Sequence, residues 1–263
     1  DGTDTGSVAT AHMKVSAATD AETPCDKLSL LVRRHADGSC DREVIGSVAG
    51  CRKADWQDGD GQTLTRMFRD PALQMVSFTI TEKGYALRDM DGTLLPVVAQ
   101  DLAAGPFRPR HTLSIAVSLL YQRFLAGGSP IAVVSMDNCA QNGKKLRDSC
   151  LTLAEGWQKG GFVPEDFLRW LSCEESVSFP WSMIDKITPH PSQKVADQLT
   201  ALGVAGMTIT KSATGTVSAP FVNAEVTEYL VLEDHFPKGR PPPEQAGVSF
   251  TGRAHGGKSG KIK

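Results

Sequence analysis

The sequence predicts an α/β fold, and two blocks of sequence are the main evidence for it. Val134–Gly143 and Phe179–Pro189 each run an apolar strand into a cluster of small polar residues and turn formers. In α/β sheets, polar side chains collect in this way at the carboxyl ends of the strands, where ligands bind. Helical and strand patterns also alternate along the chain, which favours an α/β layer over a helical bundle or a β-sandwich.

The first third of the chain predicts a β-hairpin, a short helix and a strand. Residues 27–48 hold two apolar runs on either side of Ala36–Ser39, a segment with turn chemistry, so they form the predicted hairpin. An acidic, glycine-containing loop follows at 55–61. It leads to a short amphipathic helix that starts at 64–68, and a strand follows at 75–80.

The middle of the chain alternates between helices and strands. Apolar residues recur at helical spacing from Leu113 to Phe124 and Gly127-Gly128 ends the pattern, which predicts a helix over about 110–125. A strand at 131–134 follows at once, and this helix-then-strand step is typical of a parallel sheet. The remaining predicted elements are a helix at 144–157, a helix opened by Pro164, a strand at 177–179 and a helix at 192–202.

Composition narrows the class of protein. With 263 residues, of which 40% are hydrophobic, the chain can bury a sizeable core in one large or two medium domains. The net charge of -2 gives no basic face for a nucleic-acid backbone. No apolar run is long enough to span a bilayer and the start of the chain has no leader pattern. We therefore expect a cytoplasmic protein without a membrane or nucleic-acid partner.

The cysteine and histidine residues do not predict a metal site. The six cysteines are scattered, with no Cys-x-x-Cys pair and no Cys/His grouping at zinc spacing, so we interpret them as reduced thiols. The six histidines are also dispersed and form no relay. Serine hydrolase chemistry has no G-x-S-x-G elbow in this sequence.

Asn138 is the first candidate for chemistry. It follows a strand that the pattern predicts to be buried, so its amide is expected to project from the strand end into a cleft. A carboxamide there can donate a hydrogen bond to an oxygen that becomes alkoxide-like in the transition state. The alternative is an Asx-turn residue that bonds its own backbone. Asn142-Gly143, further along, is most simply a turn ahead of the helix, with a geometric contribution.

Asp185 is the second candidate. It lies in an apolar setting next to Lys186, so its carboxylate either forms a salt bridge with Lys186 or another neighbour, or lines a site near a cofactor. Thr81 and Glu82 follow the strand that ends at Ile80 and are expected at the same cleft edge. The alternative for this pair is a helix N-cap with a first-turn acid, and both roles are compatible because a helix start favours phosphate.

A phosphate-loop pattern near the C-terminus supports a competing hypothesis. Gly252–Ser259 fits G-x-x-x-x-G-K-[ST] and follows a plausible strand at 248–250. A working phosphate loop needs a helix after its Lys-Ser pair, and only Gly260–Lys263 remains. This hypothesis of a nucleotide binder is therefore the weakest, and it requires Lys258→Ala to abolish ATP binding.

The two blocks resemble the mannitol dehydrogenase family, the long-chain polyol dehydrogenases that include fructuronate reductase. Three further stretches agree in kind and order, and they are Phe78–Tyr85, Ala219–Val222 and Val231–Pro241. The resemblance runs from about Leu28 to Thr251 and weakens at both ends. It implies a partial Rossmann-like doubly wound sheet with the hairpin inserted, and an NAD- or NADP-dependent, metal-free hydride transfer to or from a polyol or sugar acid of the mannitol/fructose or mannonate/fructuronate type. It also implies a monomer.

The resemblance assigns roles to particular residues. Asn138 matches the family's oxyanion-stabilising asparagine, and Lys263 falls roughly where the general-base lysine is expected. Asp185 matches an aspartate beside the nicotinamide and substrate, although Lys186 stands where the family usually has arginine and lacks its bidentate fork. The cofactor-binding set implied by the resemblance is Thr81, Glu82, Asn138, Phe179, Pro180 and Asp185.

The chain departs from the family at both ends. No glycine-rich phosphate turn opens it, and no acidic residue around Val8–His12 selects an adenosine ribose, so the choice between NAD and NADP stays open. We expect residues 1–250 to form the partial nucleotide-binding domain and 251–263 to be an atypical tail, interpreted as a truncated or frame-shifted segment. Such a fragment is expected to be nearly inactive, and a non-catalytic remnant or binding domain is the second hypothesis.

Overall fold

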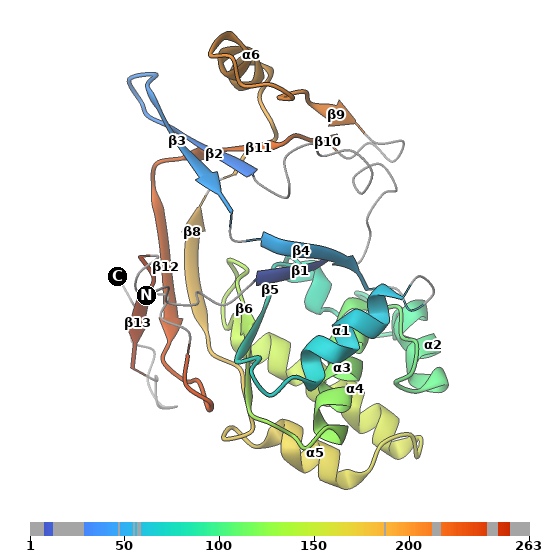
Figure 1. Cartoon of the computed structure of the whole chain (residues 1–263). Helices are drawn as coiled ribbons and strands as arrows, with labels where there is room; N and C mark the ends of the chain where they lie inside the picture. The colour runs from blue at the N-terminus through green and yellow to red at the C-terminus, as the bar shows by residue number, and fades with distance from the viewer. Residues whose placement is uncertain are drawn as a thin grey trace. The chain divides into compact units, whose positions relative to one another are not determined.

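A computed structural model of the chain describes residues 8–12, 29–46, 48–54, 56, 59–186, 188–211, 217–240 and 247–252 (Figure 1). The chain divides into two compact units, which are described separately here. Unit 1 comprises Asp1–Arg66 and Asp185–Glu228, and unit 2 comprises Met67–Ile184 and Tyr229–Lys263. The predicted phosphate-loop segment beyond Gly252, and Lys263 with it, lies outside the described residues.

Unit 1 contains the predicted hairpin. Strands β2 (Ser29–Arg34) and β3 (Cys40–Ile45) pair antiparallel, with Leu30 opposite Val44, and β11 (Phe221–Glu225) pairs parallel to β2 on its other side. The hairpin predicted at 27–48 is thus confirmed. The other described elements of unit 1 are β1 (Val8–His12) paired parallel with β4 (Val48–Lys53), most of α1 (Asp60–Arg69), α6 (Gln193–Ala201), β9 (Thr210–Lys211) and β10 (Val217–Ser218).

The core of unit 1 lies between its three-stranded sheet and α6. Val32 of β2 and Phe221 of β11 are 1% exposed, and they pack with Val195 and Leu199, one turn apart on α6. These positions face the sheet because residues four apart share one face of a helix. The helix predicted over 192–202 is confirmed by α6.

Unit 2 is built on a parallel sheet of three strands. β6 (Ile131–Ser135) lies between β5 (Met75–Phe78) and β7 (Val177–Ser178), with Met75 opposite Ala132. Every residue of β6 is buried, as expected for a strand covered on both faces. The predicted strands at 75–80 and 131–134 are present, although the first ends at Phe78. Mixed α/β architecture is therefore confirmed, with the described strands divided among five small sheets.

Helices cover this sheet. The predicted helices over 110–125 and 144–157 are present as α3 (Thr112–Leu125) and α4 (Asn142–Lys159), and Pro164 caps α5 (Glu165–Ser172). α4 packs against β6, α3 and α5 (Figure 1). The sequence pattern did not predict α2 (Pro96–Ala104), whereas the three-residue-per-turn helix η1 (Glu82–Tyr85) begins where the N-cap alternative for Thr81 placed a helix start.

β8 (Ser182–Lys186), β12 (Glu228–Glu233) and β13 (Ser249–Thr251) form another sheet of three strands. β12 lies between β8 and β13, and it runs parallel to β13. Leu232 of β12 is buried in one cluster with Ala132 and Val134 of β6. This burial ties β12 to the parallel sheet of unit 2.

Arg123, on α3, is the most unusual buried residue of unit 2. Its side chain is 1% exposed, and all five of its N–H donors reach main-chain carbonyls. The acceptors lie in two segments, Phe68–Leu73 before β5 and Ser129-Pro130 before β6, at 2.6 to 3.0 Å. Burial lowers the pKa of Arg123, while the nearby Asp70 charge opposes that shift. Arg123 therefore fixes the two chain segments that lead into the central strands.

The free cysteines differ enough to predict their reactivity. Cys150 of α4 is fully buried, and desolvation raises its pKa to about 12, so it holds almost no thiolate near neutral pH. Cys173 is exposed. We expect a thiol reagent at pH 8 to modify Cys173 rapidly and Cys150 only when the protein unfolds, at least about 100-fold more slowly. Mass spectrometry of timed labelling measures both rates, and comparable rates in the folded chain would contradict the buried position of Cys150.

Among the described residues, no helix is long and apolar enough to cross a membrane. Over the same residues, no three His, Cys, Asp or Glu side chains gather into a group that could hold a metal ion.

Candidate functional site

The candidate site lies at the carboxyl edge of the parallel sheet in unit 2. β5, β6 and β7 are parallel neighbours, so the segments that follow them leave the sheet at the same edge. These segments are Ile80–Glu82 after β5, Met136–Asn138 after β6 and Phe179-Pro180 after β7. Five of the six residues of the predicted cofactor-binding set, all but Asp185, belong to these three segments.

Asp137 connects the first two segments. Its Oδ1 accepts a hydrogen bond from the backbone N–H of Thr81 and its Oδ2 from that of Ile80, both at 2.9 Å. The N–H groups of Ile80 and Thr81 follow directly on β5, but they donate to the Asp137 side chain and not to the backbone of a neighbouring strand. For this reason β5 ends at Phe78, although the apolar pattern continues to Ile80.

Tyr85 supports Asp137 from the interior. The tyrosine is 4% exposed, and its hydroxyl donates to Asp137 Oδ2 and lies 2.6 Å from Ser135 Oγ. Burial, and then the hydrogen bond with Asp137, raise the pKa of Tyr85 well above its usual range. The phenol therefore stays protonated at neutral pH and can act as a donor.

Asn138 itself is exposed, and the predicted projection of its amide into a cleft stays a prediction. Within the part of the chain that the structure describes, its side-chain amide makes no hydrogen bond, so the Asx-turn alternative is not observed. Both the donor and the acceptor of this amide are available to a ligand.

Asn142 has the geometric role expected for it. Its Nδ2 donates to Asp137 O at 3.0 Å and to both Ser182 O and Ser182 Oγ at 2.9 Å, while its Oδ1 accepts from Gly143 N and Ser182 N. Ser182 Oγ also donates to Ser135 O at 2.5 Å. One buried amide thus joins the end of β6, the start of α4 and the start of β8.

Thr81 and Glu82 begin η1, but the N-cap alternative is only partly observed. Thr81 occupies the N-cap position without a side-chain capping bond, and its φ of 62° and ψ of 162° lie in a region that is essentially restricted to glycine. Glu82 forms an ion pair with Lys145 of α4 at 2.5 Å, and this hydrogen bond raises the pKa of Lys145. The ion pair fixes the turn from the helix that follows β6.

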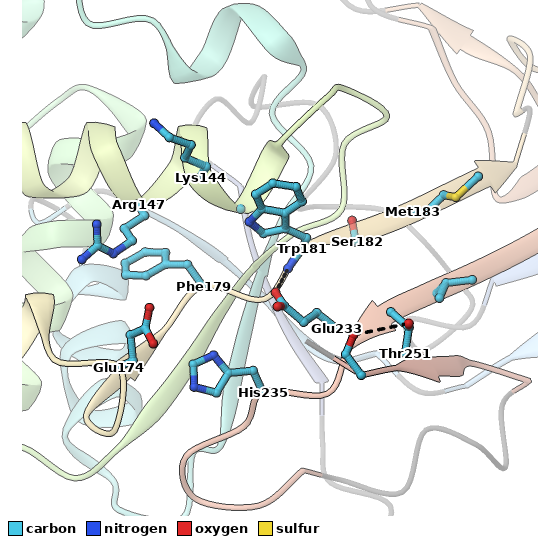
Figure 2. A pocket seen from close by; sticks show the side chains of 13 residues that line it. Lys144, Arg147, Glu174, Phe179, Trp181, Ser182, Met183, Glu233, His235 and Thr251 are labelled. Carbon is cyan, nitrogen blue, oxygen red and sulfur yellow. Dashed lines mark hydrogen bonds between the residues drawn. The ribbon is translucent and has the colours of Figure 1, made fainter. Parts of the chain in front are cut away.

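A pocket of about 410 Å³ opens beside this edge (Figure 2). Figure 2 shows Phe179 and Trp181 at its centre, with Arg147 and His235 on its sides. Trp181 N donates to Glu233 Oε2 at 3.1 Å across the pocket wall. The other lining residues are Gly143, Lys144, Glu174, Ser182, Met183, Val231, Glu233, Thr251 and Gly252. Of the predicted site residues, Phe179 lines this pocket, Pro180 is buried, and Thr81, Glu82 and Asn138 are not part of the lining.

Gly143 is a point of close approach between α4 and the pocket wall. A Cβ atom added there would lie 2.5 Å from Trp181 Cδ1, 2.6 Å from Phe179 O and 3.0 Å from Pro180 O. Two of these three atoms belong to the backbone. The glycine after Asn142 is therefore required by packing.

Asp185 belongs to unit 1 and lies near the end of β8. Lys186 pairs with Glu228, and its hydrogen bond lowers the pKa of that carboxyl group, so the predicted alternative of an Asp185–Lys186 salt bridge is not observed. Over the described residues Asp185 has no ion pair. Its placement near a cofactor stays a prediction, and so does the role of Lys263.

Sequence reasoning missed the residues that hold the edge together, namely Asp137, Tyr85 and Lys145. Asp137 directly follows a fully apolar strand and directly precedes Asn138, which was a usable signal. Tyr85 and Lys145 had no such signal, because their partners lie about 50 to 60 residues away in the sequence.

Comparison with known proteins identifies the family. The family profile described as the mannitol dehydrogenase Rossmann domain matches residues 26–203. The D-mannonate oxidoreductase of Thermotoga maritima is 45% identical over 223 residues, which cover 85% of this chain and 41% of the relative.

Two solved structures are also similar. A substrate-free D-sorbitol dehydrogenase matches with a TM-score of 0.77 and 28% identity, over 95% of this chain and 48% of that one. The Pseudomonas fluorescens mannitol 2-dehydrogenase, in a ternary complex with NAD and D-mannitol, matches with a TM-score of 0.67 and 30% identity, over 86% and 42%. This chain spans less than half the length of each of the three proteins. It belongs to the mannitol dehydrogenase family.

Proposed function

We propose that this chain provides the cofactor-binding domain of an NAD(P)-dependent dehydrogenase that moves hydride between a secondary alcohol carbon of a polyol or sugar acid and nicotinamide. The observation that carries the proposal is the shared carboxyl edge of β5, β6 and β7, found in a member of this family. In this proposal the three strands belong to a doubly wound sheet, and residues 1–250 form the domain.

The residues present at this edge fit such a cofactor. The exposed amide of Asn138 has no internal partner among the described residues, and the Thr81–Glu82 turn stands beside it at the end of the neighbouring strand. The proposed binding set is Thr81, Glu82, Asn138, Phe179, Pro180 and Asp185. The choice between NAD and NADP is part of the test below.

Asn138 has the central role in the proposed chemistry. When bound, nicotinamide accepts or returns the hydride. The Asn138 amide donates a hydrogen bond to the substrate oxygen as negative charge develops there, and Lys263 is proposed as the base that takes the hydroxyl proton. Two hydrogen bonds hold the backbone beside Asn138 in place, because Asp137 O accepts from both Asn142 Nδ2 and Cys139 N.

Titration with reduced nicotinamide cofactors tests the proposal. We expect NADH or NADPH to bind the purified chain with a dissociation constant in the micromolar range, measured by the enhancement of cofactor fluorescence. Whichever of the two binds more tightly identifies the natural cofactor. Mannitol and mannonate are then added to the complex, and an increase in cofactor affinity indicates that the substrate occupies the same edge.

ATP serves as the control ligand, because only the phosphate-loop hypothesis requires it to bind. Failure of both NADH and NADPH to bind at millimolar concentration would contradict the proposed function and favour a non-catalytic binding domain. Binding of ATP alone, lost in Lys258→Ala, would favour the phosphate-loop hypothesis.

A further inference from the structure

We infer that Asp137 is a positioning residue, whose carboxylate holds the Ile80–Thr81 turn in its strained conformation and so sets where Thr81 and Glu82 stand beside Asn138. The inference rests on the proposed function, since it concerns residues proposed to meet the cofactor. It adds a residue that the family resemblance did not assign.

The geometry places Asp137 between the two strand ends. It is the residue directly before Asn138, and its two carboxylate oxygens reach back to Ile80 N and Thr81 N at 2.9 Å each. The backbone of the same segment is joined to β5 by the bond from Met136 N to Phe78 O at 2.8 Å. Any movement of the carboxylate therefore moves the turn relative to Asn138.

The strained backbone conformation of Thr81 requires contacts that stabilise it. Threonine is β-branched, and a φ of 62° with a ψ of 162° is a region that L residues with a Cβ avoid. Thr81 makes no side-chain capping bond that would stabilise the turn from within. Strained residues persist only when their surroundings fix them. On the amino side of Thr81 these contacts are the two bonds to Asp137, and on its carboxyl side Thr81 O accepts from Gly84 N at 2.9 Å.

The carboxylate is itself fixed from the interior. Buried Tyr85 donates to Asp137 Oδ2, and its hydroxyl also meets Ser135 Oγ at 2.6 Å. Ser149 of α4 donates to Tyr85 O at 2.9 Å, which secures the tyrosine on the helix side. Asp137 thus accepts from three donors with an oriented carboxylate, as an acceptor-only group can.

The Asp137→Asn variant tests the hydrogen bonds of the carboxylate without a change in side-chain size. Asp137→Asn keeps the volume but replaces one acceptor oxygen by an NH₂ group, which would face an N–H donor. Thr81→Gly removes the backbone strain at position 81, because glycine adopts the Thr81 conformation without strain. If Asp137 acts by holding that strain, Thr81→Gly must compensate for Asp137→Asn.

The experiment combines cofactor affinity with amide hydrogen exchange in the parent chain, Asp137→Asn, Thr81→Gly and the double variant. We expect Asp137→Asn to weaken NADH binding about tenfold or more, the scale at which misplaced binding groups act. The Ile80 and Thr81 amides should lose protection while the amides of β6 keep theirs. Thr81→Gly removes a proposed cofactor contact, so it is the reference for the double variant, whose NADH affinity should lie within about twofold of that of Thr81→Gly alone. Asp148→Asn, which removes an exposed partner of Lys144 on α4, is the matched control and should change neither measurement.

Each other outcome is decisive. Unchanged NADH affinity in Asp137→Asn, with faster exchange at Ile80 and Thr81, overturns the positioning role and leaves the proposed function intact. Loss of protection throughout β6, without recovery in the double variant, shows a purely structural role and also overturns the inference. A parent chain that binds neither NADH nor NADPH overturns the proposed function and this inference together.

Discussion

Arg123→Met is expected to destabilise unit 2 by about 5 kcal/mol or more, the largest single effect in the chain. Methionine fills a similar space but donates no hydrogen bond, so all five carbonyls lose the guanidinium, and of the five Asp70 O keeps its bond from Leu73 N. A buried acceptor that loses its donor costs about 1 to 3 kcal/mol. Since whole domains are stable by about 5 to 15 kcal/mol, this variant stands near the limit of folding.

Urea unfolding followed by circular dichroism measures the loss. Arg123→Lys keeps the charge but has three donors in place of five, so it should fall between the parent and Arg123→Met. Arg169→Met is the control, because Arg169 is exposed on α5 and its ion pair among the described residues is with Asp166, a surface pair worth about 0 to 1 kcal/mol. Equal stabilities for Arg123→Met and Arg169→Met would contradict the described role of Arg123.

Gly143→Ala is expected to destabilise the fold by about 3 kcal/mol and to reshape the pocket. The new methyl group would stand 2.6 Å from Phe179 O and 2.5 Å from Trp181 Cδ1, so either the backbone after β7 or the start of α4 must shift. Overpacking of this kind typically costs about 1 to 3 kcal/mol, and the upper end applies because the obstacle is largely backbone.

Gly156→Ala on the same helix is the matched control. Its added Cβ would meet the end of the Leu102 side chain, which can rotate, and alanine gains helix propensity over glycine. The stability of Gly156→Ala should therefore stay within about 1 kcal/mol of the parent. Thermal unfolding compares the two variants, and tryptophan fluorescence reports the shift of Trp181. A Gly143→Ala protein as stable as Gly156→Ala would show that the pocket wall yields easily.

Sequence patterns predicted the elements whose cause is local. α3 and α4 follow from apolar spacing and from the glycines and turn residues at their ends, and the fully apolar β6 follows from its composition. β5 was predicted two residues too long, because what ends it is the carboxylate of Asp137, 57 residues from Ile80. α2 was missed because its apolar residues are spread around the helix and leave no stripe.

The candidate site also combines features with a local cause, which were predictable, and features that depend on distant residues, which were not. The buried strand shortly before Asn138 was predictable, because it depends on a local apolar run. The supporting contacts were not, since each joins residues that are distant in sequence, as in Tyr85 to Asp137 and Asn142 to Ser182. Lys186 illustrates the difficulty, because its partner is Glu228 and not the adjacent Asp185. Residue types alone do not distinguish between such partners.

The bonding of Arg123 also affects how unit 2 responds to solvent. Exposed ion pairs such as Lys145 with Glu82 weaken when electrolyte screens the charges. Peptide carbonyls do not titrate, and screening hardly reaches a guanidinium that is 1% exposed. The segments that lead into β5 and β6 therefore remain tied together in concentrated salt solutions, under conditions that weaken the ion pair between Glu82 and Lys145 of α4.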